Sequence, residues 1–164
     1  MRAGGDLQSY LQERSGRQLP EREARTIIAQ VFDGLCYLNS NHELRNASGE
    51  KSMQRVIHYD LKPANILFDD LGMVKISDFG LSKLLAADSG HSCLELTSPG
   101  AGTLYYQPPE CQMVGPNQRA PVISSKVDVW AAGAPARRCV QPRSAALSAL
   151  TKELHTLLFV RKHC

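Results

Sequence analysis

The chain has 164 residues, of which 43% are hydrophobic, and a formal net charge of +3. This length and composition predict one globular unit with a core of its own, and so small a charge gives no argument for nucleic-acid binding. No apolar run approaches the ~20 residues that span a bilayer, and the N-terminus lacks the apolar region of a secretory signal, so we expect an intracellular protein. The five cysteines are odd in number and lack C-x-x-C spacing, which favours free thiols over a disulfide framework or a zinc site.

Two helices are predicted in the N-terminal quarter. Asp6 stands before an apolar set at i, i+3 and i+4 spacing, so we expect a short helix capped by this carboxylate. Pro20 opens a longer helix whose apolar stripe predicts burial of one side. Gly34 inside that helix costs about 1 kcal/mol relative to alanine, so burial of the stripe has to hold the helix. The stripe consists of Ala24, Ile27, Ile28, Val31, Phe32, Leu35 and Leu38.

The next two segments differ in what they predict. Residues 39–54 are polar and rich in turn formers, so we expect an exposed loop. Residues 65–76 contain two short β-compatible runs joined by turn formers, which predicts a β-hairpin. Such a hairpin would fold Asp78 back beside Asn65.

The residues around this hairpin carry chemistry. Asp60, Lys62 and Asn65 share one loop, and Asp78 follows the next apolar run. Transfer of a γ-phosphoryl group needs a carboxylate to orient and deprotonate the attacking hydroxyl, and oxygen ligands for magnesium. We therefore expect Asn65 and Asp78 to face one cation. Aspartate and asparagine also populate turns, and Gly80 also fits an ordinary turn, so each signal alone has a structural alternative.

The pattern H-x-D-x-x-x-x-N, followed by D-F-G, resembles the catalytic and magnesium loops of a eukaryotic protein kinase. The resemblance implies that Asp60 is the catalytic base and that Lys62 contacts the transferred phosphate. It also implies that Asn65 and Asp78 hold Mg²⁺. His58 is then expected to pack in the loop, because Asp60 already fills the role of the base.

An ATP site follows from the same resemblance. Asp6 matches a position just after the hinge between the two kinase lobes, where an acidic residue contacts the ribose hydroxyls. Asp6 either makes that contact or only caps its helix, and both interpretations stand. The nucleotide contacts that the resemblance implies are Asp6, Lys62, Asn65, Leu67 and Asp78.

Residues 81–110 resemble an activation segment. Thr103 near its end is expected to hydrogen-bond near Asp60 and Lys62, which completes an implied catalytic set of Asp60, Lys62, Asn65 and Thr103. Lys62 together with Thr103 is the pattern of serine/threonine kinases. Tyr59 stands where the common pattern has an arginine that pairs with a phosphorylated segment, and a tyrosine cannot supply that charge. Activation through this position therefore does not carry over.

Several short stretches resemble the Tousled-like kinases in particular: residues 58–63, 78–83, 96–98, 100–103 and 108–111. Residues 124–130 extend the resemblance to the start of a central helix, where Asp128 is implied to brace the catalytic loop. The implied fold is mainly α with a short β-hairpin, as in part of a kinase C-terminal lobe. The implied partners are ATP and a protein substrate, and the implied location is the nucleus, otherwise the cytoplasm.

The resemblance stops abruptly after Gly133. We expect residues 1–133 to form a partial kinase domain and residues 134–164 a divergent tail with one amphipathic helix. Pro135 removes a helix hydrogen bond at a cost of ~3 kcal/mol, so the central helix is expected to end early and the later C-terminal helices to be replaced. The 164 residues contain no G-x-G-x-x-G loop and no V-A-I-K-like strand, so the N-terminal lobe is expected to be absent.

Two functions from different classes follow. The first is a serine/threonine protein kinase that uses ATP and Mg²⁺, with Asp60 orienting the acceptor hydroxyl and with weak or no activity in the isolated chain. The alternative is a non-catalytic truncated fragment, either a binding module or the product of a mis-spliced or mis-predicted coding sequence. The intact set of chemical residues motivates the first, and the missing phosphate-covering motifs motivate the second.

Overall fold

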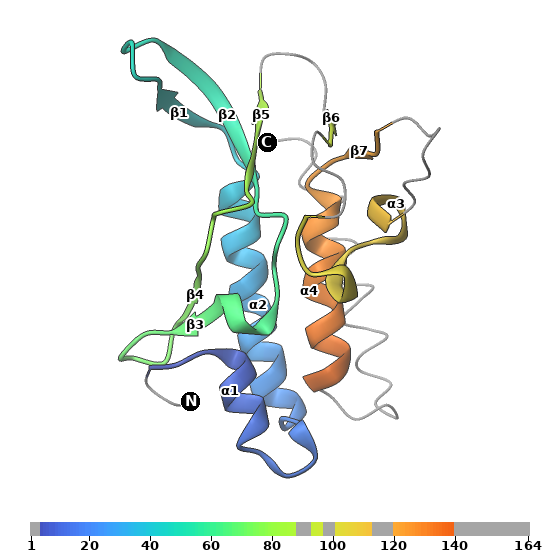
Figure 1. The fold of residues 1–164 in the computed structure, drawn as a ribbon. Coiled ribbons are helices and arrows are strands. Elements are labelled where there is room, and N and C mark those ends of the chain that lie inside the picture. The colour runs from blue at the N-terminus through green and yellow to red at the C-terminus, as the bar shows by residue number, and fades with distance from the viewer. Residues whose placement is uncertain (1–3, 88–92, 97–100, 113–119, 140–164) are drawn as a thin grey trace.

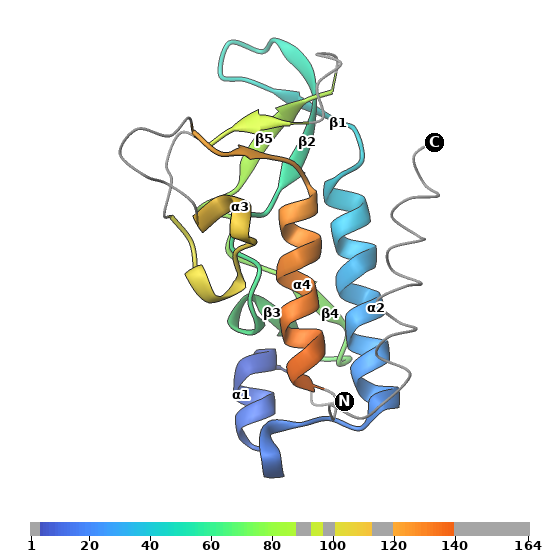
Figure 2. The same ribbon diagram turned by 90° about the vertical axis from the view of Figure 1, so that its right-hand side faces the viewer.

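Two long helices form the centre of the molecule (Figure 1). The computed structural model describes residues 4–87, 93–96, 101–112 and 120–139, with side chains described up to residue 134. Helix α2 (Glu21–Leu38) packs against α4 (Lys126–Cys139), and the two run side by side in both views (Figures 1 and 2). Helix α1 (Leu7–Gln12) lies near the N-terminal end of α2, followed by a 3₁₀ turn (Ser15–Arg17). Within these ranges no helix combines the length and apolar character needed to cross a membrane.

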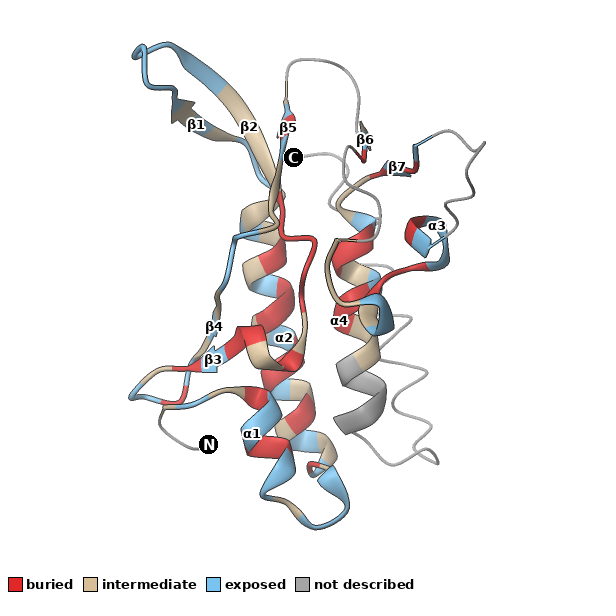
Figure 3. Ribbon diagram, in the orientation of Figure 1, coloured by how far each residue is buried: buried red, intermediate tan, exposed pale blue. Residues whose placement is uncertain are grey.

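The two N-terminal helices form as predicted. Asp6 caps α1, because its Oδ1 accepts a hydrogen bond of 2.9 Å from the Ser9 amide. The α2 stripe is buried except for the partly buried Leu38 at its end, and it forms most of the main core (Figure 3). A Cβ on Gly34 would lie 2.8 Å from Cδ1 of Ile76, so this glycine lets β4 approach α2 closely.

The predicted hairpin is also present. Strands β3 (Ile66–Phe68) and β4 (Val74–Ile76) pair antiparallel. Asp69 closes the turn, with Oδ1 accepting from the amides of Leu71 (3.0 Å) and Met73 (2.8 Å). The hairpin is anchored to α2, because the side-chain oxygen of Gln30 accepts a 3.0 Å hydrogen bond from the Val74 amide.

The expectation of a loop over residues 39–54 is wrong. Strand β1 (His42–Arg45) pairs with β2 (Lys51–Ile57), which also pairs with β5 (Lys83–Ala86) to give a three-stranded antiparallel sheet. The polar residues in the turn support it, since Asn46 Oδ1 accepts from the amides of Ser48 (3.1 Å) and Glu50 (2.9 Å). Cross-strand pairing therefore determines the secondary structure of this segment, although its low hydrophobicity favours a loop.

The remaining described elements are short. They are the 3₁₀ turns Pro63–Asn65 and Leu104–Tyr106, the short helix α3 (Pro109–Gln112), and the paired strands β6 (Leu94–Glu95) and β7 (Val122–Ile123). The described part thus has three small antiparallel sheets beside its four α-helices, more strand than the single hairpin predicted.

Helix α4 corrects a second expectation. We expected the central helix to end early because of Pro135, yet α4 continues through that residue to Cys139. A proline in a helix interior removes a single hydrogen bond, and the rest of the helix can hold its geometry when one face is buried. Ala131 and Ala132 supply that burial in the main core. The amphipathic helix predicted further on lies outside the described residues.

Candidate active site

The segment that follows β2 is held in place by one carboxylate from α4. Asp128 is 3% exposed, and its two oxygens accept hydrogen bonds of 2.8 Å from the main-chain amides of His58 and Tyr59. Tyr59 has φ +68°, a left-handed conformation that is unfavourable for a side chain of this size. Burial raises the pKa of the Asp128 carboxyl, and the two amide hydrogen bonds offset part of that effect. Asp128 therefore fixes a strained backbone just before Asp60.

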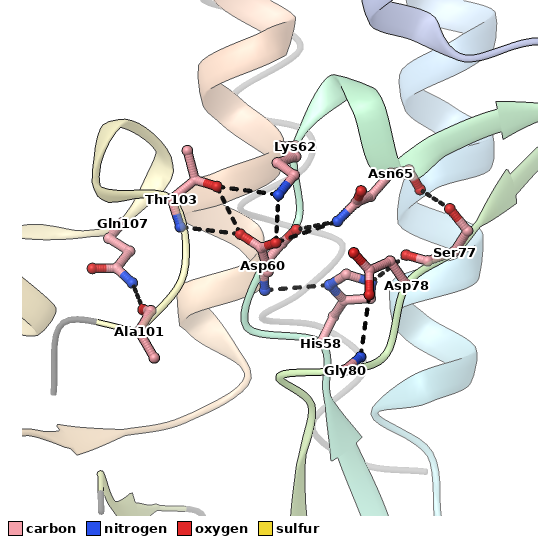
Figure 4. Close-up of polar contacts among 10 residues, drawn as sticks. All are labelled: His58, Asp60, Lys62, Asn65, Ser77, Asp78, Gly80, Ala101, Thr103 and Gln107. Atoms are coloured by element: carbon pink, nitrogen blue, oxygen red, sulfur yellow. Dashed lines mark hydrogen bonds and ion pairs between the residues drawn. The ribbon is translucent and has the colours of Figure 1, made fainter. Parts of the chain in front are cut away.

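Asp60 lies at the centre of a polar cluster (Figure 4). Its Oδ2 lies 2.6 Å from the Lys62 ammonium nitrogen, and its Oδ1 accepts from the Thr103 amide (3.0 Å) and hydroxyl (2.9 Å). Lys62 also contacts the Thr103 hydroxyl at 3.3 Å. The side-chain nitrogen of Asn65 donates to the Asp60 carbonyl at 2.9 Å. All four members of the catalytic set implied by the sequence thus meet around one carboxylate.

The charge state of Asp60 follows from this cluster. Burial raises the pKa of the Asp60 carboxyl, but hydrogen bonds from Lys62 and Thr103 outweigh burial and leave the pKa below its usual value. Asp60 is therefore ionised at neutral pH, ready to accept a proton from a hydroxyl placed against it.

Ser77 joins the D-F-G turn to this cluster. Its amide donates to the Asn65 carbonyl at 2.9 Å, and its own carbonyl lies 2.9 Å from Nε2 of the buried His58. The Phe79 ring also packs edge-on against the His58 ring, with centroids 5.0 Å apart. Asp78, next in the chain, has φ +64° and is held near the catalytic loop by these contacts. His58 thus packs between the two loops, as expected.

The comparison with known proteins agrees with this arrangement. Residues 1–142 match the protein kinase domain family. The chain belongs to the protein kinase family. Its kinase relatives include the serine/threonine-protein kinase TOUSLED of Arabidopsis thaliana, 49% identical over 131 residues that cover 80% of this chain and 17% of the relative. The serine/threonine-protein kinase tousled-like 1 of Homo sapiens is 44% identical over 144 residues, which cover 85% of this chain and 17% of the relative.

These similarities identify a Tousled-like serine/threonine kinase domain sequence. The same name, tousled-like 1, belongs to a Caenorhabditis elegans relative that is 43% identical over 92% of this chain. The chain spans less than a fifth of the length of these kinases, between 14% and 17% of each. The match to the kinase domain family also continues past Gly133.

The kinase family uses magnesium, and the donor set here fits that ion. The nitrogen of the Asn65 side chain is used on Asp60, which leaves its carbonyl oxygen as an acceptor. Asp78 offers a carboxylate whose hydrogen bond to the Gly80 amide is long, at 3.4 Å. Magnesium keeps several waters and takes one or two protein oxygens beside the phosphates, so two such residues suffice. The described residues contain no group of three histidine, cysteine or acidic side chains suited to a metal.

The two remaining residues predicted to contact the nucleotide, Asp6 and Leu67, lie together at the edge of the β3–β4 hairpin. Asp6 forms a β-bridge with Leu67, and the Gly5 carbonyl accepts from the Phe68 amide at 2.9 Å. Leu67 is 36% exposed and presents an apolar surface beside Asp6. Because the Asp6 carboxylate accepts from Ser9, its capping role is confirmed, while the ribose contact remains a prediction.

The sequence did not predict a role for two residues of the candidate active site, Ser77 and Gln107. Ser77 couples the two loops through its main chain, and Gln107 packs beneath the Thr103 segment. Ser77 precedes Asp78 directly, so its place in the motif was a usable signal. Nothing in the local pattern around Gln107 indicated a role for its amide.

Removing the Lys62 charge should raise the pKa of Asp60. In Lys62→Met the ammonium contact at 2.6 Å is lost, so the carboxylate loses its largest favourable partner. A lowered pKa in the folded state means that Asp60 adds stability above its unfolded pKa of ~3.9, and that this stability is lost as the pH falls through the folded pKa. The free energy of unfolding of Lys62→Met should therefore decrease less than that of wild type as the pH is lowered through the folded-state pKa of Asp60.

Carboxyl ¹³C NMR titration measures the Asp60 pKa in each variant. Lys75→Met serves as the control, because Lys75 pairs with the distant Asp69 at 3.4 Å. We expect an upward shift in Lys62→Met and none in Lys75→Met. Equal Asp60 values in wild type and Lys62→Met would show that the ion pair does not set the charge state.

Proposed function

We propose that this chain carries the catalytic-loop part of a protein kinase that transfers the γ-phosphoryl group of ATP to serine or threonine hydroxyls of a protein. The observation that carries the proposal is the Asp60 carboxylate, held ionised by Lys62 and Thr103. Within a kinase domain the described residues correspond to part of the C-terminal lobe. The resemblance to Tousled-like kinases supports the further proposal that this chain acts in the nucleus, with the cytoplasm as the alternative.

Each residue of the cluster has one task in this proposal. Asp60 orients the acceptor hydroxyl and takes its proton as the new bond to phosphorus forms. Thr103 fixes the Asp60 carboxylate through its Oδ1, and Lys62 offers a positive charge where the transferred phosphoryl group carries negative charge. When bound, Mg²⁺ neutralises the β- and γ-phosphates, and Asn65 and Asp78 would hold it.

The isolated chain should be weakly active or inactive. Its 164 residues contain no glycine-rich phosphate loop and no V-A-I-K-like strand. Loss of one preorganised charge-stabilising donor commonly costs ~10² to 10³ in rate, and these motifs supply several such donors. The competing proposal is a non-catalytic fragment that retains the fold of the loop but neither binds nucleotide nor transfers phosphate.

Nucleotide-dependent stabilisation tests the proposal. A competent site in the presence of ATP and Mg²⁺ at 100 times Kd gains about 2.7 kcal/mol, which raises the thermal midpoint. We expect a shift for the wild-type chain that needs Mg²⁺ and is lost in Asp78→Ala. The control is Asp33→Ala, which removes an exposed carboxylate of α2 and should keep the shift.

Two outcomes of this experiment would contradict nucleotide binding by this chain. One is the absence of any shift in wild type, and the other is an equal shift in Asp78→Ala. Either result favours the non-catalytic fragment.

A further inference from the structure

Two glutamine side chains donate hydrogen bonds to main-chain carbonyls near the end of the activation segment. Gln107 is 5% exposed, and its Nε2 donates to the carbonyl of Ala101 (Figure 4). Gln112, in α3, donates from Nε2 to the carbonyls of Gln107 (2.8 Å) and Leu104 (3.0 Å). The two amides therefore tie together the start, middle and end of one short loop.

The orientation of the Gln107 amide is fixed by its partner. A main-chain carbonyl can only accept, so the side-chain nitrogen must face Ala101. The side-chain oxygen of Gln107 is then buried without a hydrogen-bond partner among the described residues. An unpaired buried acceptor lowers stability, and a leucine of similar size would avoid that loss. Among the described residues, the donor of the Gln107 amide is therefore the part that makes a contact.

The loop held by Gln107 is the one that meets Asp60. Gly102 separates Ala101 from Thr103, and a Cβ on it would lie 2.8 Å from the Gln107 nitrogen and 3.4 Å from the Tyr59 carbonyl. Gln107 also lines the same small hollow as Tyr59, Asp60 and Thr103. A displacement of the Ala101 carbonyl would therefore reach the Thr103 amide through a single residue, Gly102.

Tyr59 stands where the common kinase pattern has an arginine, so position 59 offers no positive charge to the activation segment. Tyr59 is buried with Cys111, Ile123 and Val127 in an apolar cluster. The segment thus packs on this tyrosine through apolar contacts. The side-chain hydrogen bonds to its carbonyls among the described residues come from the two glutamines, in addition to the main-chain bonds of the turn at Leu104–Tyr106.

We propose that Gln107, supported by Gln112, is a positioning residue that holds residues 101–103 so that Thr103 stays bonded to Asp60. Its importance for phosphoryl transfer rests on the proposed function, but its effect on Thr103 does not. Gln107 acts through Thr103 and touches neither substrate nor phosphate in this proposal.

Amide hydrogen exchange of Thr103 tests the proposal in the full chain. Gln107→Leu removes the donor but keeps the volume, so the Thr103 amide should exchange about five- to tenfold faster, as expected for loss of one net hydrogen bond. The Asp60 pKa, read by carboxyl ¹³C NMR, should rise as the bonds from Thr103 weaken. The thermal midpoint should change little, because removal of the unpaired side-chain oxygen offsets the lost bond to the Ala101 carbonyl.

Gln107→Glu provides a pH-dependent rescue. A buried glutamic acid has a raised pKa, and only its protonated form can donate to the Ala101 carbonyl. The ratio of Thr103 exchange rates between Gln107→Glu and wild type should therefore fall toward one as the pH is lowered. The control is Gln54→Leu, which removes an amide of β2 that donates to Ser52 and should leave Thr103 unchanged.

The outcomes separate this proposal from the proposed function. Unchanged Thr103 exchange and Asp60 pKa in Gln107→Leu would overturn the positioning role, as would changes accompanied by general loss of protection throughout α2. If Thr103 responds as expected while ATP with Mg²⁺ gives no thermal shift in the wild-type chain, positioning stands and the proposed function fails.

Discussion

Replacing Asp128 with alanine should lower the free energy of unfolding by roughly 2–6 kcal/mol, because two buried amides each lose an acceptor at ~1–3 kcal/mol. The donors are the amides of His58 and Tyr59, both bonded at 2.8 Å. Tyr59 also has a positive φ, and the bond from its amide to Asp128 helps to hold this unfavourable conformation. The loss is a large share of the ~5–15 kcal/mol that holds a domain together.

Denaturant unfolding of matched variants measures this loss. Asp128→Asn keeps one acceptor oxygen and should lose about half as much as Asp128→Ala. Asp33→Ala, at an exposed position of α2, should change the free energy of unfolding by less than about 0.5 kcal/mol. If Asp128→Ala is no more destabilising than Asp33→Ala, the catalytic segment is held by other contacts.

Asp60→Asn should lower phosphate incorporation into a protein substrate by ~10² to 10⁴, the usual contribution of a positioned general base. Asparagine keeps an oxygen that can accept from Thr103, so the fold should persist while the proton acceptor is lost. Transfer from γ-labelled ATP with Mg²⁺ measures the effect against the slow wild-type rate. Asp70→Asn, in the exposed β3–β4 turn, is the matched control and should keep that rate.

Equal incorporation by wild type and Asp60→Asn at a rate above background would count against Asp60 as the base. A wild-type rate that stays at background at every enzyme concentration would instead favour the non-catalytic fragment.

Features with local causes were predictable from the sequence. The α2 stripe repeats at helical spacing, and Asp6 precedes its helix as a capping residue should, so both helices could be placed. The β3–β4 hairpin was predictable because turn formers separate two short apolar runs. The contact of Asp60 with Thr103 joins residues 43 apart in the chain, and only the kinase resemblance indicated it.

Other features depend on tertiary contacts that no local pattern reports. Strand β1 lies in a polar segment rich in turn formers, and it forms because β2 offers it a partner and Asn46 closes the turn. Pro135 disfavours a helix, yet α4 continues because Ala131 and Ala132 are buried in the core just before it. The role of Gln107 depends on a carbonyl that only the folded loop brings within reach.

Paramagnetic NMR with Mn²⁺ in place of Mg²⁺ tests the shared cation site most directly. With a non-hydrolysable ATP analogue, Mn²⁺ should selectively broaden the side-chain amide signals of Asn65 and the main-chain signals of Ser77 and Asp78. Signals of the β1–β2 turn should stay sharp. Broadening centred on the Asp69 turn, or none at Asn65 and Asp78, would contradict a cation site shared by Asn65 and Asp78 beside Asp60.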